Sequence, residues 1–425
     1  MGSNLFLKQF IGIGLLVLSC GPAGLLYAEN ISISQSLELA QTRSLQEVQA
    51  ALQETKAKAA RDTANSQKWP RISAVGQYST SDNIATQLPD DNQMLLKAEQ
   101  NLLPFLSPDW VKAGQKEAEF KASQTEHVAS RQDVELLVKQ LYFAILRDED
   151  AVEQTDKVAK EFQTLLNFLV PQFSVGHAPR FDMVKVKAAL SDLARSRALT
   201  LAQLAGEKGE LIQVIGLEIT DDIDLAPVSI LPELPVVAND GDLTDNPTLR
   251  ALGQRGEAAR IGLDADNFSR LPSLNATFRY GYTAPTWDNL SSSWDATVQL
   301  NLPLLDWGAI SSQTDQDRAD WQLSQNALEN QRQQLQSQLK QVQATAQAYL
   351  EDEKRLEALL PETEQASHAA LKQYRAGAMG IVETTDAVNL WLQTNLNERN
   401  AYYSYLTNLA QLERLTGDKC KVKYE

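Results

Sequence analysis

The amino-acid sequence repeats itself at a spacing of about 200 residues, and this repeat limits the possible folds more than any other feature. Four motifs recur in the same order: "KWPRISAVGQYST" returns as "SRLPSLNATFRYGYT", "NLLPFLSPDW" as "NLPLLDWG", "FSVGHAPRFD" as "YRAGAMGIVETTD", and "LIQVIG" as "LERLTG". Collinear matches at nearly one spacing are not expected by chance. The sequence therefore predicts two copies of one structural unit, at residues 29–217 and 242–417, with a linker at residues 218–241 and a tail at residues 418–425.

Both units begin with signals for a helix. Ser32 and Gln35 have the spacing of a capping box, and Asn246 followed by Pro247 is a favourable helix start. Apolar residues continue the first helix at helical spacing, namely Leu45, Val48 and Leu52.

The stretches after these helices alternate between apolar and polar residues, which predicts β-strands with two different faces. The alternation is regular from Leu274 to Tyr282 and from Trp294 to Leu302, and weaker in the first unit. We expect β-hairpins at about 71–103 and at about 272–303. Strands of about 10 residues suit a transmembrane barrel. A sheet whose polar face meets water would show the same pattern.

A seven-residue apolar repeat then predicts long helices that pack on one another. In the second unit it consists of Trp321, Leu328, Leu335, Val342, Tyr349 and Leu356, with Leu339 and Ala346 beside it. We expect a helix of about 100 Å from Gly308 to Ala376, interrupted near Pro361. A turn at "YRAGAMG" precedes a return helix from about Ile381 to Leu415, and the first unit predicts the same hairpin with its turn at "FSVGHAPRFD".

Residues 1–28 have the features of a signal peptide, with Lys8 ahead of an apolar run and a small residue, Ala28, at the expected cleavage point. An uncleaved anchor is the alternative. The stretch "VLSCG" also resembles a bacterial lipobox, which makes Cys20 a candidate for lipidation. If cleavage follows Ala28, Cys420 is the single remaining cysteine, so no disulfide can form within one chain.

Composition argues against several classes of function. The net charge of −16 disfavours a nucleic-acid partner. The three histidines are far apart and the two cysteines are remote, so no metal-ligand spacing is present. No phosphate-binding loop or catalytic constellation is found, and we expect neither a cofactor nor an enzyme. No apolar run after the signal peptide is long enough for a transmembrane helix.

Together, "LNLPLLDWG" after the last strand and the tips "YRAGAMGIVETTDA" and "FSVGHAPRFD" resemble the outer-membrane efflux protein family of the TolC type. The resemblance covers nearly the whole chain after the signal peptide. It implies an α+β membrane protein and a homotrimer in the outer-membrane lipid of a Gram-negative-type cell. Each subunit would give four strands to a trimeric twelve-stranded barrel, and its coiled-coil helices to a periplasmic α-barrel.

The function implied is that of an exit duct of a tripartite efflux or type I secretion system, which conducts its cargo passively. The partners would be a periplasmic adaptor protein and an inner-membrane pump, driven by protons or by ATP. The sequence leaves open whether the cargo is a drug, a metal ion or a polypeptide. A periplasmic trimeric coiled-coil scaffold or adhesin without a channel is the alternative, although it leaves the strands and the long repeat unexplained.

The resemblance also assigns roles near the tips. Asp182, Tyr374, Glu383 and Asp386 match positions that form the periplasmic gate, and Met379 stands where the best-known members have a basic residue. Glu383 and Asp386 are three residues apart and would share one helix face, although acidic residues near a helix start also stabilise its dipole. Adaptor docking is expected at the two turns, namely Val175, Gly176 and His177, and Ala376, Gly377 and Ala378.

The stretch "LNLPLLDWG" is expected to mark the membrane boundary. Pro303 would end the strand pairing, Asp306 would cap the following helix, and Gly308 would allow the chain to bend.

Overall fold

The structure is a computed structural model that describes residues 30–79, 91–103, 107–218, 223–228, 230–235, 243–284, 291–417 and 422–424. Several predictions lie outside these residues: the signal peptide at residues 1–28, lipidation of Cys20, Cys420, and the motif around Pro104.

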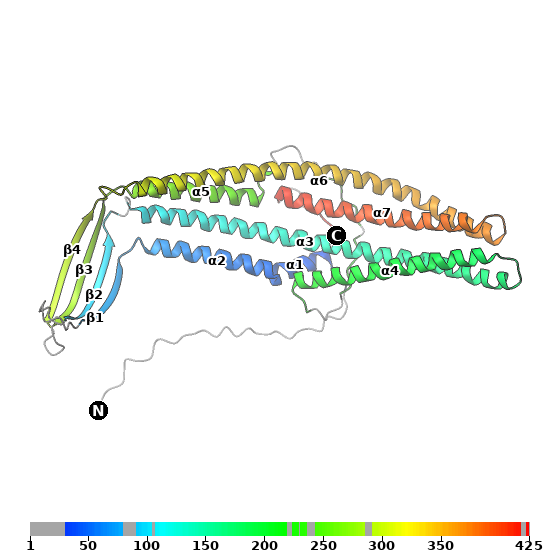
Figure 1. Cartoon of the computed structure of the whole chain (residues 1–425), viewed down its shortest axis with the longest axis horizontal. Coiled ribbons are helices and arrows are strands. Elements are labelled where there is room, and N and C mark those ends of the chain that lie inside the picture. Colours follow the sequence, from blue (N-terminus) through cyan, green and yellow to red (C-terminus); the bar gives the residue numbers. More distant parts are fainter. Residues whose placement is uncertain are drawn as a thin grey trace, which may run out of the picture.

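The described chain forms one four-stranded sheet with long helices running away from it (Figure 1). In chain order the elements are α1 (Ile33–Arg43), α2 (Leu45–Ser66), β1 (Arg71–Ser79), β2 (Asp91–Asn101), α3 (Pro108–Ser174), α4 (Arg180–Ile215), α5 (Pro247–Phe268), β3 (Ser273–Ala284), β4 (Ser291–Asn301), α6 (Ala309–Arg375) and α7 (Ile381–Thr416). Helices α3 and α6 each have 67 residues, α4 and α7 each have 36, and α2 and α5 each have 22. Apart from α1, the helices of the first half thus have counterparts of identical length in the second half.

Each long helix is accompanied by two shorter ones that follow each other along its length (Figure 1). Helices α2 and α4 lie beside α3, and α5 and α7 lie beside α6. The joint between α5 and α7 is made by Asn246, whose side chain accepts hydrogen bonds from the N–H groups of Thr248 and Leu249. The same side chain donates to the carbonyl of Leu415 at 3.0 Å. The predicted cap at Asn246 and Pro247 is confirmed, and so is the capping box at Ser32 and Gln35.

The expected interruption near Pro361 was wrong, because α6 runs unbroken from Ala309 to Arg375 with Pro361 inside it. Pro171 lies inside α3 in the same way. A proline removes one N–H donor and crowds one carbonyl of the preceding turn. A helix that packs on neighbours along most of its length can absorb that loss, since tertiary packing supplies most of its stability.

The sheet has the order β1-β2-β3-β4, and all neighbours are antiparallel. Cross-strand partners such as Leu96 with Tyr280, and Tyr280 with Trp294, place apolar side chains on one face. On the other face, Arg279 donates to Asp295 of the neighbouring strand at 2.9 Å. The predicted alternation is therefore confirmed in β3 and β4, and β2 joins it despite its weaker pattern.

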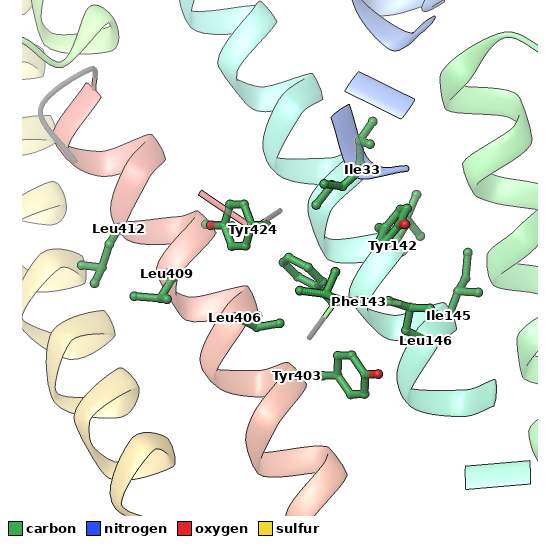
Figure 2. Close-up of a cluster of buried hydrophobic side chains, with 14 of the residues drawn as sticks. Ile33, Tyr142, Phe143, Ile145, Leu146, Tyr403, Leu406, Leu409, Leu412 and Tyr424 are labelled. Carbon is green, nitrogen blue, oxygen red and sulfur yellow. The ribbon is translucent and has the colours of Figure 1, made fainter. Parts of the chain in front are cut away.

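The largest core lies midway along the helices, where α1, α3 and α7 meet (Figure 2). Tyr142, Phe143 and Ile145 of α3 are fully buried there with Leu406 and Leu409 of α7. Within the predicted seven-residue repeat of α6, Leu335, Leu339 and Ala346 are buried, and Leu328, Val342 and Tyr349 pack against the same core.

Tyrosine hydroxyls hold the segment between the two halves against this core. Tyr142 donates to the carbonyl of Ala226 at 2.6 Å, and Tyr405 donates to that of Pro232 at 2.7 Å. Burial raises the pKa of Tyr405 to about 12, so its hydroxyl stays protonated and remains a donor in the physiological range. Among the residues described, no helix combines the length and apolar character needed to cross a bilayer.

Candidate gate at the tips of the helical hairpins

The molecule ends, far from the sheet, in two helical hairpins, which we call the first hairpin (α3 and α4) and the second hairpin (α6 and α7). Their turns have the same backbone conformation and the same pattern of hydrogen bonds. Gly176 and Gly377 adopt positive φ values of 79° and 71°, which favour glycine. The N–H of His177 donates to the carbonyl of Gln172 at 2.9 Å, and that of Ala378 donates to Gln373 at 2.9 Å. The predicted tips are thus helix C-caps, and their exposed residues include Val175 and Ala376.

A hydrogen bond joins the two hairpins near their tips. The hydroxyl of Tyr374 on α6 donates to Oδ2 of Asp182 on α4 at 2.5 Å. Burial and the neighbouring Asp182 carboxylate both raise the pKa of Tyr374, because each disfavours a phenolate. The resemblance assigned both residues to the gate, and the structure brings them into contact. Their role in gating stays a prediction.

A second apolar cluster lies behind this contact and fixes its position. Val186 of α4, Leu371 of α6 and Val388 of α7 are buried within it, and Tyr374 packs against its edge. The tyrosine ring is therefore held by packing while its hydroxyl reaches the other hairpin. Both the hydrogen bond and the packing of the ring must be lost before the two hairpins can separate here.

Glu383 and Asp386 are both exposed on the first two turns of α7, but they differ in their surroundings. A Cβ atom placed on Gly380 would lie 2.4 Å from Oε2 of Glu383, so this carboxylate folds back over the start of its own helix. That position favours the helix dipole for Glu383. Asp386 makes no hydrogen bond or ion pair with any residue that the structure describes. Glu383 therefore lies over the start of its own helix, whereas Asp386 lies about one turn further along α7.

Met379 is partly buried in the second tip, and no basic side chain replaces the residue that the family pattern has there. Neither Arg180 nor Arg375 forms an ion pair with a described residue. At this end of the molecule, the polar link between the hairpins of one chain is the hydrogen bond from Tyr374 to Asp182.

The turn between β4 and α6 behaves as predicted. Asp306 accepts hydrogen bonds from the N–H groups of Ile310 at 2.8 Å and Gly308 at 3.1 Å, and these bonds lower its pKa. Gly308 has a φ of 88°, which bends the chain into the helix, and β4 ends at Asn301, two residues before Pro303. The sequence did not reveal that Trp307 also has a positive φ, of 52°, with its side chain 90% exposed.

Comparisons with known proteins match the second unit alone in one case and both units in the other. Residues 242–418 match the family model described as outer membrane efflux protein. Across both halves, the chain is 22% identical over 364 residues to the outer membrane protein TolC of Vibrio cholerae, an alignment that covers 82% of each protein. The second unit of the chain belongs to the outer membrane efflux protein family. The family model covers the second unit, which also carries the clearer form of the "LNLPLLDWG" pattern.

Solved structures have the same fold as this chain. The CmeC outer membrane channel of Campylobacter jejuni superimposes with a TM-score of 0.84 at 16% identity, over 91% of this chain and 85% of that one. The MtrE outer membrane channel of Neisseria gonorrhoeae, solved in an open state, gives 0.82 at 17% identity, over 92% and 89%. These likenesses establish the fold of the chain, in which long helices run away from a four-stranded sheet.

No group of three or more histidine, cysteine, aspartate or glutamate side chains suited to a metal ion occurs in the described ranges. The chemistry of the site is thus that of carboxylates, one tyrosine hydroxyl and small turn residues.

Proposed function

We propose that this efflux protein is a passive exit duct formed by three copies of the chain. The observation that carries the proposal is the four-stranded sheet, which has one apolar face. Its two outer strands, β1 and β4, are each paired on one side only among the described strands of the chain. A sheet in lipid needs every backbone group paired, so its edges must close. Pairing of β4 in one copy with β1 in the next closes the sheet around an aqueous interior.

The helices support the same arrangement. They cross the molecule in the order of the strands, so α2 lies at one edge and α6 at the other (Figure 1). The stripe formed by Leu45, Val48 and Leu52 on α2 is predominantly exposed in the single chain, at 74%, 47% and 64%. If β1 pairs with β4 of the next copy, this stripe faces the neighbour's α6, where Leu323 is 63% exposed. Leu52 and Leu323 both lie roughly 20 residues from the strand ends, hence at a similar depth.

The proposed partners bind at the two tips. An adaptor protein would dock its own helices on the exposed turns, and an inner-membrane pump would supply the energy. The small residues Gly176, Ala376, Gly377 and Ala378 allow a close approach of another backbone. In the closed state the bond from Tyr374 to Asp182 holds the hairpins of each copy together, and Asp386 of the three copies lines the mouth. Docking would open the mouth by separating the hairpins. The cargo is a solute small enough to pass the opened mouth.

Crosslinking tests the ring of copies. In a cysteine-free background, Leu52→Cys combined with Leu323→Cys is expected to give covalent trimers on oxidation. The matched control combines Leu52→Cys with Leu359→Cys, which places the second exposed cysteine in the distal half of α6. Trimers from the first pair together with solute flux into liposomes support the duct. Crosslinked trimers without flux would instead favour a scaffold, and absence of crosslinks from the first pair contradicts the arrangement.

A further inference from the structure

Both ring nitrogens of His127 on α3 contact carboxylates of α2. Nδ1 lies 2.7 Å from Oε2 of Glu54, and Nε2 lies 3.2 Å from Oε1 of Glu47. The two glutamates are seven residues apart on α2, so the imidazole bridges two turns of that helix. The site is in the helical part of the molecule, far from the strands and from the tips.

The two contacts differ in the ring protons that they require. An ionised carboxylate only accepts hydrogen bonds, and a neutral imidazole carries one N–H. Both contacts can therefore be hydrogen bonds at the same time only when His127 is an imidazolium. We propose that His127 is a pH-dependent clasp, which in its protonated form fastens the start of α2 to α3 and releases Glu47 when it loses its proton.

The two carboxylates are not equivalent, and this decides which contact is lost. Glu54 has the shorter bond to His127 and also accepts a hydrogen bond from Gln124. Glu47 has the longer bond, and its other oxygen, Oε2, is buried without a hydrogen-bond partner among the described residues. A neutral His127 would keep its one proton for Glu54, so Glu47 would lose its donor while still partly buried. A buried carboxylate without a donor is costly, which favours movement of Glu47 toward water.

The charged groups in contact with the ring are Glu47 and Glu54 on α2, and Lys58 on the same helix acts on Glu54. On α3, Glu126 precedes His127 and Arg131 lies one turn after it, paired with Glu135. Arg255 is already paired with Glu126, its Nε lying 2.6 Å from Oε1. The hydrogen bond from His127 lowers the pKa of Glu54, so that carboxylate stays ionised in weakly acidic medium. Histidine is the side chain that changes charge between about pH 5 and 8. The clasp is therefore closed when the imidazole carries two ring protons and open when it carries one.

The position of Glu47 means that its release would affect the start of α2. Glu47 lies in the first turn of α2, next to the joint at Ser44, whose side chain makes no capping hydrogen bond to α2. The same turns carry the exposed residues Leu45 and Val48. Release of Glu47 would loosen these first turns of α2. The periplasm exchanges protons freely with the surroundings, so the device would respond to external pH.

Hydrogen–deuterium exchange on the purified full-length oligomer tests the proposal. After correction for intrinsic exchange, protection of the amides from Gln46 to Glu54 is expected to fall about tenfold between about pH 5.5 and pH 8. In His127→Gln the protection should be equally low at both pH values. The matched control is His368→Gln, a histidine on α6 that packs on Trp391 and should keep the full pH dependence. Protection that is independent of pH in the wild type, or the same pH dependence in His127→Gln, would overturn the proposal.

A second measurement needs no variant at position 127. Nitrogen NMR of histidine-labelled wild-type protein should show two ring protons on His127 at about pH 5.5 and one at about pH 8. The assignment follows by elimination from His177→Gln and His368→Gln. A single ring proton at the acidic pH would exclude the clasp.

Discussion

The hydroxyl of Tyr374 on the second hairpin donates a hydrogen bond of 2.5 Å to Asp182 on the first. The two residues are 192 positions apart in the sequence, and each lies within a few residues of its own tip. Because the ring of Tyr374 packs on a buried cluster and its hydroxyl has a raised pKa, the bond persists at neutral and moderately alkaline pH. This contact is the part of the proposed gate that one chain supplies by itself.

The first prediction concerns that bond. Tyr374→Phe removes the hydroxyl and should destabilise the closed tip by about 1 to 2 kcal/mol per chain, since the acceptor is charged. Cells that carry this variant should become more sensitive to bulky antibiotics that the outer membrane normally excludes. The control is Tyr349→Phe on the same helix, because the Tyr349 hydroxyl has no hydrogen bond in the described part of the chain. Equal sensitivity of the two variants would contradict a latch at Tyr374.

The second prediction separates the two acidic residues of α7. Asp386 has no partner among the described residues, whereas Glu383 folds over its own helix start. A ring of three carboxylates favours cations, so Asp386→Asn should lower the cation-to-anion permeability ratio by about twofold or more. Glu383→Gln should change this ratio less and should mainly weaken the first turn of α7. Bilayer reversal potentials measure both effects, and unchanged selectivity and divalent block in Asp386→Asn would remove it from the pore.

The third prediction tests the packing of the sheet. A Cβ atom on Gly281 of β3 would lie 2.0 Å from the carbonyl oxygen of Met94 on β2, so Gly281→Ala must push the two strands apart. We expect a loss of about 3 kcal/mol, seen as a lower melting temperature of the oligomer in detergent. Gly76→Ala in the neighbouring strand β1 is the control, since nothing lies within 4 Å of its added Cβ. A Gly281→Ala oligomer as stable as Gly76→Ala would show that the strands separate more widely than described.

The fourth prediction uses the Asp306 cap in the turn between β4 and α6. The N–H groups of Ile310 and Gly308 lower the pKa of Asp306, so its carboxylate stabilises the fold at neutral pH. This contribution is present above the pKa of an unfolded aspartate and is lost as the pH falls through the lowered folded value. Asp306→Asn should therefore melt below the wild type at neutral pH, and the difference should shrink in strong acid. Thermal melts across pH provide the measurement, and a gap that widens in acid would contradict the cap.

Local patterns predicted the elements well because their causes are local. The capping box at Ser32, the alternation in β3 and β4, and the cap at Asp306 each depend on residues a few positions apart. The internal repeat added the order of the elements. The contact of Tyr374 with Asp182 came from the resemblance, since no spacing in the sequence joins residues so far apart.

Other features escaped prediction because they depend on distant parts of the chain. Pro361 does not end its helix, since packing along α6 outweighs one lost hydrogen bond. The clasp of His127 with Glu47 and Glu54 joins two helices that are separated by a hairpin of the sheet. In the sequence these are three polar residues without a recognisable motif. Only their burial and their contacts in the structure show that they interact.

Single-channel recording on the purified oligomer in planar bilayers tests the central claim most directly. The wild type should show a small, cation-selective conductance, because Tyr374 and Asp182 keep the tips together. Tyr374→Phe should raise the conductance severalfold while leaving the oligomer intact, because the lost bonds in three copies shift the closed tips toward open ones. An oligomer that inserts into the bilayer but passes no current in either form would contradict an exit duct gated at these tips.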